Sequence, residues 1–174
     1  MNVSCVNCIF VCVKQHLRCN LDSIESTLKI PISVLVVIYK LSGDVLLIER
    51  ADRANFWQSV TGSLDAPNED LALAASREVF EETGIAVDYL PIGSLVNMQH
   101  HIEYEIYPEW RYRYAPGVIK NIEHWFALEV PENTPITLSP REHVAYQWLP
   151  YQEAAKKCFS LSNGQAILQW FSTH

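Results

Sequence analysis

Three glutamates lie close together near the middle of the sequence, at positions 78, 81 and 82. On a helix, the spacings i, i+3 and i+4 place Glu78, Glu81 and Glu82 on one face. Like charges at this spacing repel, so something nearby must offset the cost. A hard divalent cation would do so, because Mg²⁺ binds carboxylate oxygens and completes its coordination with water and phosphate. The spacing alone leaves two interpretations open, a cation site or a solvated acidic surface.

A helix over residues 69–83 is expected to carry these glutamates. Asn68 is predicted as its N-cap, because a short polar side chain can accept hydrogen bonds from the free N–H groups of the first turn. Gly84 is predicted as the C-terminal cap, where glycine adopts a left-handed conformation at low cost. Between the two caps, apolar residues recur at helical spacing: Leu71, Ala74, Ala75 and Val79.

The remaining segments predict strands before and after this helix, and helices at the C-terminal end. Residues 31–39 form a nearly continuous β-branched run, which is typical of a strand buried on both faces. Further strands are expected at 45–49, 56–61, 122–130 and 144–149, with one or two in 85–106. A short helix is expected from Pro150, and a terminal helix over 164–171. This order predicts an α+β fold with a mixed sheet.

Composition favours a single domain that works on small molecules. The chain has 174 residues, 49% of them hydrophobic, which suffices for one core. Its net charge of −7 disfavours binding to nucleic acid or to an anionic membrane surface. No apolar run is long enough for a spanning helix. We therefore expect neither a nucleic-acid partner nor a membrane partner.

Four of the five cysteines precede residue 20, with the spacing C-x2-C-x3-C-x6-C: Cys5, Cys8, Cys12 and Cys19. A zinc or iron–sulfur site is one interpretation, but structural zinc sites usually combine two C-x2–4-C pairs, and only one is present. We therefore interpret residues 1–28 as an N-terminal extension that is disordered or not native. Residues 29–174 form the expected domain. Such cysteine usage is no disulfide framework, which favours a reducing cytoplasm.

Gly62, Glu69 and the run 77–85 together resemble the Nudix box, G-x5-E-x7-R-E-U-x-E-E-x-G-U, in which U is a bulky aliphatic residue. Seven residues separate Glu69 from Arg77, as the box requires, and both aliphatic positions are filled. Six residues rather than five separate Gly62 from Glu69. We interpret the extra residue as a loop variation, because loops accept insertions at low cost. The resemblance extends from about Lys29 to the C-terminus.

Resemblance to this family implies a Nudix-type α/β/α sandwich in which the box helix carries metal ligands. It implies hydrolysis of a phosphoric anhydride with Mg²⁺ as cofactor and Mn²⁺ as a possible substitute. The expected metal ligands are Glu78, Glu82 and Glu142, the last recruited from a loop outside the box. The expected catalytic residues are Glu81, Glu82 and Glu142. Arg77 is expected to orient a box glutamate, and Glu142 has the alternative of an ordinary exposed loop acid.

Four further residues are expected to contact the substrate. Lys29 and Arg50 are predicted to bind phosphate, with solvated charges at strand ends as the alternative. Thr61 and Ser160 are predicted to hydrogen-bond substrate atoms, with strand packing and helix capping as alternatives. His143 has no recognisable zinc spacing and is interpreted as structural or as supporting the site.

Segments outside the box resemble Nudix hydrolases that act on a pterin triphosphate in folate synthesis. The expected substrate is therefore a small-molecule triphosphate, and the alternative is a housekeeping (d)NTP pyrophosphohydrolase that prefers dATP. The aromatic and basic segment 107–116 either stacks on the pterin or packs as a loop or dimer contact. A monomer or a weak homodimer is expected.

Overall fold

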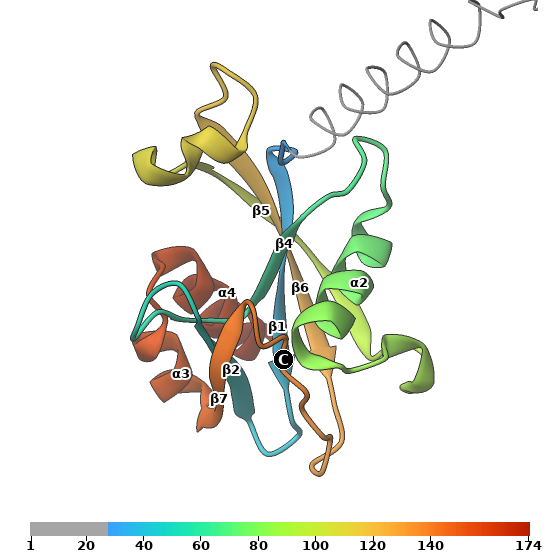
Figure 1. Ribbon diagram of the computed structural model, residues 1–174. Coiled ribbons are helices and arrows are strands. Elements are labelled where there is room, and N and C mark those ends of the chain that lie inside the picture. The colour runs from blue at the N-terminus through green and yellow to red at the C-terminus, as the bar shows by residue number, and fades with distance from the viewer. Residues whose placement is uncertain (1–27) are drawn as a thin grey trace, which may run out of the picture.

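The computed structural model describes residues 28–174, which form one mixed β-sheet with helices on both faces (Figure 1). The hydrogen-bonded strand order is β3 (Trp57–Gln58), β2 (Asp44–Arg50), β1 (Ile32–Tyr39), β6 (Lys120–Glu129) and β5 (Leu95–Glu105). In addition, β4 (Val60–Ser63) pairs with β1, and β7 (His143–Pro150) pairs with β2. Only β1 and β6 pair in parallel among these strands; the other pairs are antiparallel.

Helix α2 (Leu71–Thr83) covers one face of the sheet, and α3 (Tyr151–Lys157) and α4 (Leu161–Thr173) cover the other (Figure 1). This arrangement confirms the predicted sandwich with a mixed sheet. Residues 1–27 of the N-terminal extension, which include its four cysteines, lie outside the described residues. Within residues 28–174, no helix combines the length and the hydrophobicity needed to cross a membrane.

Strand β1 lies at the centre and contributes to two cores. Val34 and Val36 pack in the core that contains Val79 of α2. Leu35 and Val37 point the other way, into the core that contains Ile167 of α4. The strand is therefore buried on both faces, as its β-branched run predicts.

Helix α2 begins at Leu71, two residues later than predicted, and Asp70 rather than Asn68 is its N-cap. The Asp70 carboxylate accepts hydrogen bonds from the backbone N–H groups of Ala72 at 2.8 Å and Leu73 at 3.1 Å. Residues 68 and 69 remain in the loop before the helix. At the other end the prediction is confirmed: Gly84 has φ of 72° and donates its N–H to Phe80 O at 2.9 Å.

Two segments with ambiguous patterns are resolved by the structure. The segment 85–106 contains one strand, β5, preceded by the 3-10 helix η1 (Val87–Tyr89). The aromatic segment forms a second 3-10 helix, η2 (Pro108–Arg113). Its Trp110 packs against Tyr107 and Phe56, with ring centroids 5.2 and 6.1 Å away.

The terminal helix α4 begins at Leu161, three residues earlier than predicted, with Ser160 as its N-cap. Gly164 therefore lies inside the helix rather than at its start. Tertiary packing explains why a glycine occupies this interior position. A Cβ atom built on Gly164 would stand 2.7 Å from the backbone oxygen of Ala155 in α3. Only glycine allows the two helices to approach this closely.

We expect Gly164→Ala to destabilise the protein, although alanine is the better helix former. The added methyl group must push α3 and α4 apart, and overpacking of this kind costs about 1–3 kcal/mol in the free energy of unfolding. Denaturant unfolding measures the change. Gln165→Ala, at an exposed position of the same helix, is the control and should change stability by less than about 0.5 kcal/mol. A more stable Gly164→Ala protein would contradict the close approach of the helices.

Candidate active site

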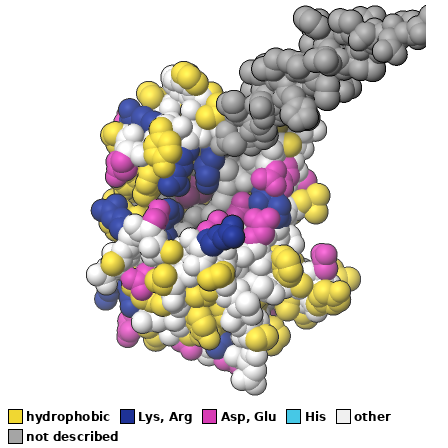
Figure 2. Space-filling view, in the orientation of Figure 1, with side chains coloured by type: hydrophobic (Ala, Val, Ile, Leu, Met, Phe, Trp, Pro, Cys, Tyr) yellow, Lys and Arg dark blue, Asp and Glu magenta, His cyan; other side chains and the backbone are white. Residues whose placement is uncertain are grey.

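A cavity of about 490 Å³ opens between α2, β4 and the loop that precedes β7. Figure 2 shows a hollow in this face of the molecule, with basic and acidic side chains gathered around it. Seven of the eight predicted site residues line this cavity: Lys29, Arg50, Thr61, Glu78, Glu81, Glu82 and Glu142. Ser160 does not, and lines an adjacent cavity instead. Residues from five separated segments of the chain are thus brought together.

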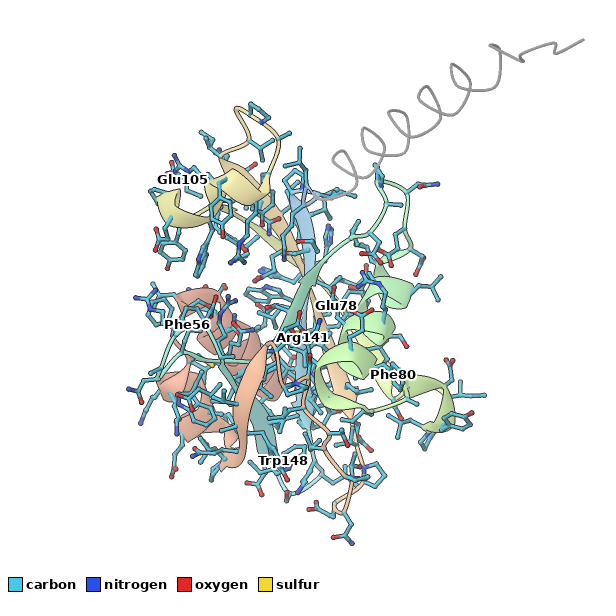
Figure 3. The ribbon with its side chains drawn as sticks, in the orientation of Figure 1. Phe56, Glu78, Phe80, Glu105, Arg141 and Trp148 are labelled. Atoms are coloured by element: carbon cyan, nitrogen blue, oxygen red, sulfur yellow. The ribbon has the colours of Figure 1, made fainter. Side chains whose placement is uncertain are left out.

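Helix α2 presents its three glutamates to the cavity in unequal environments. Glu78 and Glu82 are buried, with only 9% and 6% of their surface exposed. Glu81 is exposed. In Figure 3, Glu78 points from α2 toward the centre of the site, while Phe80 of the same helix lies on the outer side. The solvated acidic surface, one of the two interpretations of the spacing, is therefore wrong for Glu78 and Glu82.

Arg77 neutralises part of this acidic cluster. Its Nη1 donates to Glu78 Oε1 at 2.7 Å and to Glu81 Oε2 at 3.3 Å. Its Nε donates to Glu69 Oε1 at 3.0 Å, and its Nη2 to the backbone oxygen of Ser63. Charge-assisted hydrogen bonds of this kind fix the carboxylate geometry. Arg77 thus orients a box glutamate, as expected from the sequence.

Glu69 lies at the other side of the guanidinium, away from the cavity lining. It binds Arg77 through both carboxylate oxygens and also accepts from the backbone N–H of Asp65 at 2.6 Å. These bonds to a cation and a backbone donor lower the pKa of Glu69. Glu69 therefore holds Arg77 and the loop 63–70 in place.

Gly62 of β4 lies directly against the carboxylate of Glu78. A Cβ atom built on Gly62 would stand 1.7 Å from Glu78 Cδ, so no side chain fits there while Glu78 keeps its position. The extra residue between Gly62 and Glu69 is therefore absorbed in the loop and leaves Gly62 in register with the box. Burial raises the pKa of Glu78 to about 7, and the hydrogen bond from Arg77 opposes this rise.

Glu82 lies where α2, β4 and β7 meet. Its Oε2 accepts from the backbone N–H of Thr61 at 3.3 Å, and its Oε1 is 3.2 Å from His143 Nε2. Glu142, Glu82 and His143 each offer a ligand atom, and the three atoms lie within 4.8 Å of one another. Burial raises the pKa of Glu82, and His143 opposes this rise.

His143 is not among the candidate ligands expected from the sequence, where it is interpreted as structural or as supporting the site. It is 3% exposed, and neither ring nitrogen has a well-aligned hydrogen bond within the described part of the chain. The pairing of β7 with β2 places it opposite Arg50, and the backbone N–H of Ala51 binds Glu142 O at 2.8 Å. Its position next to Glu142 in the sequence was the available signal. A search for zinc-type spacing could not find this site, because His143 lies next to Glu82, which comes from α2 and is distant in the sequence.

Cationic side chains also line the cavity. Arg50 is held by both oxygens of Asp52, at 2.8 and 2.6 Å, and Arg113 lies 4.0 Å from the same carboxylate. Lys29 is anchored through its backbone N–H, which donates to Arg113 O at 2.7 Å. Sequence reasoning did not include Arg141, which also lines the cavity and is labelled in Figure 3.

A second cavity of about 500 Å³ adjoins the first. The two share Lys29, Arg50 and Arg113 in their lining, together with residues 61–63 of β4. The second cavity has aromatic walls formed by Phe56, Tyr107, Trp110 and Tyr114. Ser160 also lines it, but its hydroxyl already caps α4 by accepting from Asn163 N at 3.3 Å and Nδ2 at 2.8 Å. The capping alternative for Ser160 is therefore realised at the cavity wall.

The donor set of the first cavity fits a hard divalent cation. Glu82 and Glu142 supply carboxylate oxygens as metal ligands. The buried ring of His143, whose nitrogens lack well-aligned hydrogen bonds within the described residues, offers a further ligand atom. Glu78 lines the same cavity but is engaged by Arg77 and lies outside this three-residue cluster. Excess negative charge at Glu82 and Glu142 would be offset by a bound cation.

Comparison with known proteins agrees with this geometry. Residues 29–171 match the NUDIX domain. The chain is 44% identical over 147 residues to dihydroneopterin triphosphate diphosphatase of Escherichia coli, covering 84% of this chain and 95% of that protein. It is 37% identical over 139 residues to the Haemophilus influenzae protein of the same name, covering 79% and 85%.

Solved structures give the same result. The structure of the E. coli dihydroneopterin triphosphate pyrophosphohydrolase matches with a TM-score of 0.76 and 43% identity, over 85% of this chain and 99% of that one. A Caenorhabditis elegans Ap4A hydrolase shares the fold at 21% identity and a TM-score of 0.61, over 82% and 96%. With the box helix, the acidic cavity and these relatives in agreement, the chain belongs to the Nudix hydrolase family.

Proposed function

We propose that this enzyme hydrolyses 7,8-dihydroneopterin triphosphate to dihydroneopterin monophosphate and pyrophosphate, a step of folate biosynthesis, with Mg²⁺ as its cofactor. The observation that carries the proposal is 44% identity, over 95% of its length, to a relative named for this reaction. The two adjoining cavities support it, because one collects acids and the other aromatic side chains. In a triphosphate attached to a flat ring, the phosphate chain matches the first cavity and the ring matches the second.

Glu82, Glu142 and His143 would hold the divalent cation, with Glu78 as a further carboxylate in the same cavity. When bound, Mg²⁺ neutralises phosphate oxygens and stabilises charge on the leaving pyrophosphate. Carboxylate oxygens suit both Mg²⁺ and Mn²⁺, so we expect Mn²⁺ to act as a substitute.

The remaining residues position the substrate and the water. Lys29 and Arg50 stand on the wall between the two cavities, where they would bind phosphate oxygens. Glu81 is exposed to solvent and tethered by Arg77, so it could accept a proton from the attacking water. Thr61 holds Glu82 through its backbone N–H, and its hydroxyl accepts from Gln58 Nε2 at 3.2 Å.

The residues of the candidate site come from a single copy of the chain. We propose a monomer or a weak homodimer that acts on small molecules in the cytoplasm. The net charge of −7 and the lone free cysteine of the described part, Cys158, support this setting.

A (d)NTP pyrophosphohydrolase that prefers dATP is the competing function, because the second cavity has room for a purine as well as for a pterin. A substrate panel separates the two. We expect the specificity constant for dihydroneopterin triphosphate to exceed that for each of the eight common (d)NTPs, measured with Mg²⁺ as pyrophosphate release. A higher specificity constant for dATP would agree with the proposed type of hydrolysis but would exclude the pterin as the preferred substrate.

We expect Glu82→Gln to lower turnover at saturating Mg²⁺ by a factor of about 10²–10⁴, because the substitution keeps the shape and removes a charge of the cation cluster. Pyrophosphate release measures the effect, and the melting temperature checks the fold. Glu153→Gln, on the exposed face of α3, is the control and should retain turnover. A folded Glu82→Gln protein with normal turnover would remove Glu82 from the site.

The products should be pyrophosphate and the pterin monophosphate, formed in one step. Clustered acids and cations along an open cavity can hold the whole triphosphate, which favours pyrophosphate as the leaving group. In ¹⁸O-labelled water, label in the monophosphate indicates attack on the α-phosphorus, and label in pyrophosphate indicates attack on the β-phosphorus. Orthophosphate as the first product, with accumulation of the pterin diphosphate, would contradict the proposed reaction.

A further inference from the structure

The second cavity contains a buried acid that the proposed hydrolysis does not use. Glu123 lies on β6, is 4% exposed, and lines the cavity on the side of α4. Its Oε1 accepts a hydrogen bond from Trp125 Nε1 at 3.1 Å. Trp125 is two residues further along the same strand, so both side chains point to the same face of the sheet.

No basic side chain among residues 28–174 forms an ion pair with Glu123. Burial raises the pKa of Glu123, and only hydrogen bonds from Trp125 and Ser162 oppose the rise. A buried carboxylate without a cation is costly to the fold. It nevertheless retains acceptor positions, because a carboxylate accepts about four hydrogen bonds.

The surroundings of Glu123 are polar and tightly held. Asn121, two residues before it on β6, donates to Ser33 Oγ at 2.7 Å and to Tyr104 OH at 3.1 Å. Asn121 is 1% exposed, and its Oδ1 has no partner within the described residues. Ser33 and Tyr104 line the cavity, as does Ser162 from α4. These bonds fix a polar inner wall around the carboxylate.

The outer part of the same cavity is aromatic: Phe56 and Trp110 pack against each other, with ring centroids 6.1 Å apart, and Tyr107, the residue before η2, lies beside Trp110. In Figure 3, Phe56 and Glu105 mark two sides of this region. The wall shared with the acidic cavity carries the cations Lys29 and Arg50. A phosphate chain bound at that wall would therefore place the attached ring in the second cavity, beside these aromatic side chains and near the polar inner wall.

We propose that Glu123 recognises the ring of the substrate by accepting hydrogen bonds from two adjacent donors, a ring N–H and an exocyclic amino group. Rings with a 2-amino-4-oxo pattern, such as pterin and guanine, present this pair of donors. Adenine presents an acceptor nitrogen beside its amino group, so one carboxylate oxygen would face a lone pair. The inference rests on the proposed triphosphate hydrolysis and names the class of ring that the site selects.

The first test uses the wild-type enzyme and two nucleotides that differ only in the 2-amino group. We expect the specificity constant for dGTP to exceed that for dITP by about 10- to 100-fold, the range typical of a bidentate contact to a base edge. Equal constants for the two, including no turnover of either, would overturn the proposal. If dGTP is favoured while dihydroneopterin triphosphate is a poor substrate, the proposed function fails and the ring recognition stands.

The second test replaces the carboxylate. We expect Glu123→Gln to reduce the dGTP-to-dITP ratio and the dihydroneopterin triphosphate-to-dATP ratio by at least about tenfold, mainly through KM, while kcat for dATP is retained. Glu153→Gln removes the same charge from an exposed position of α3 that lines neither cavity and should leave both ratios unchanged. An equal loss for all four substrates would indicate a purely structural role and overturn the proposal. Should Glu123→Gln fail to fold, the wild-type comparison decides.

Discussion

The guanidinium of Arg77 is the contact on which the site depends. Within 3.3 Å of it lie the carboxylates of Glu69, Glu78 and Glu81, together with Asp65. Without this cation, the acids of α2 would repel each other and oppose the helix that carries them. Because Arg77 is itself tied to the backbone of Ser63 and to Glu69, it also fastens the loop before α2 to the helix.

Arg77 neutralises only one side of the acidic cluster. On the other side Glu82 and Glu142 lie beside His143, and the neighbouring Arg50 is already paired with Asp52. The protein therefore keeps a local excess of negative charge where a divalent cation can bind. An acidic protein can in this way handle a polyanionic substrate, since the bound cation and the basic side chains that line the cavity provide the positive charge.

Strand β4 separates the two halves of the site and serves both. Its backbone at Thr61 donates to Glu82, and the missing side chain at Gly62 makes room for Glu78. The same strand lines the neighbouring cavity, where aromatic side chains and buried Glu123 lie. The chemical step and the recognition of the ring are thus built on opposite sides of one short strand, close enough for a single triphosphate ester to reach both.

The sequence by itself determined the helix, the face of its glutamates, the central strand and the box, because each depends on local spacing and on residue preferences within a few positions. Gly84 ends α2 and Arg77 binds Glu78 as the pattern indicates.

Other features were decided only by the tertiary structure, because they depend on contacts between distant segments. The pairing of β7 with β2 brings Glu142 and His143 to Glu82. The packing of α4 on the sheet places Ser160 in the second cavity and buries Glu123 beside it. The close approach of α3 requires glycine at position 164, in the interior of α4. No local period encodes these contacts, because burial and charge proximity arise only when the two cores form around β1.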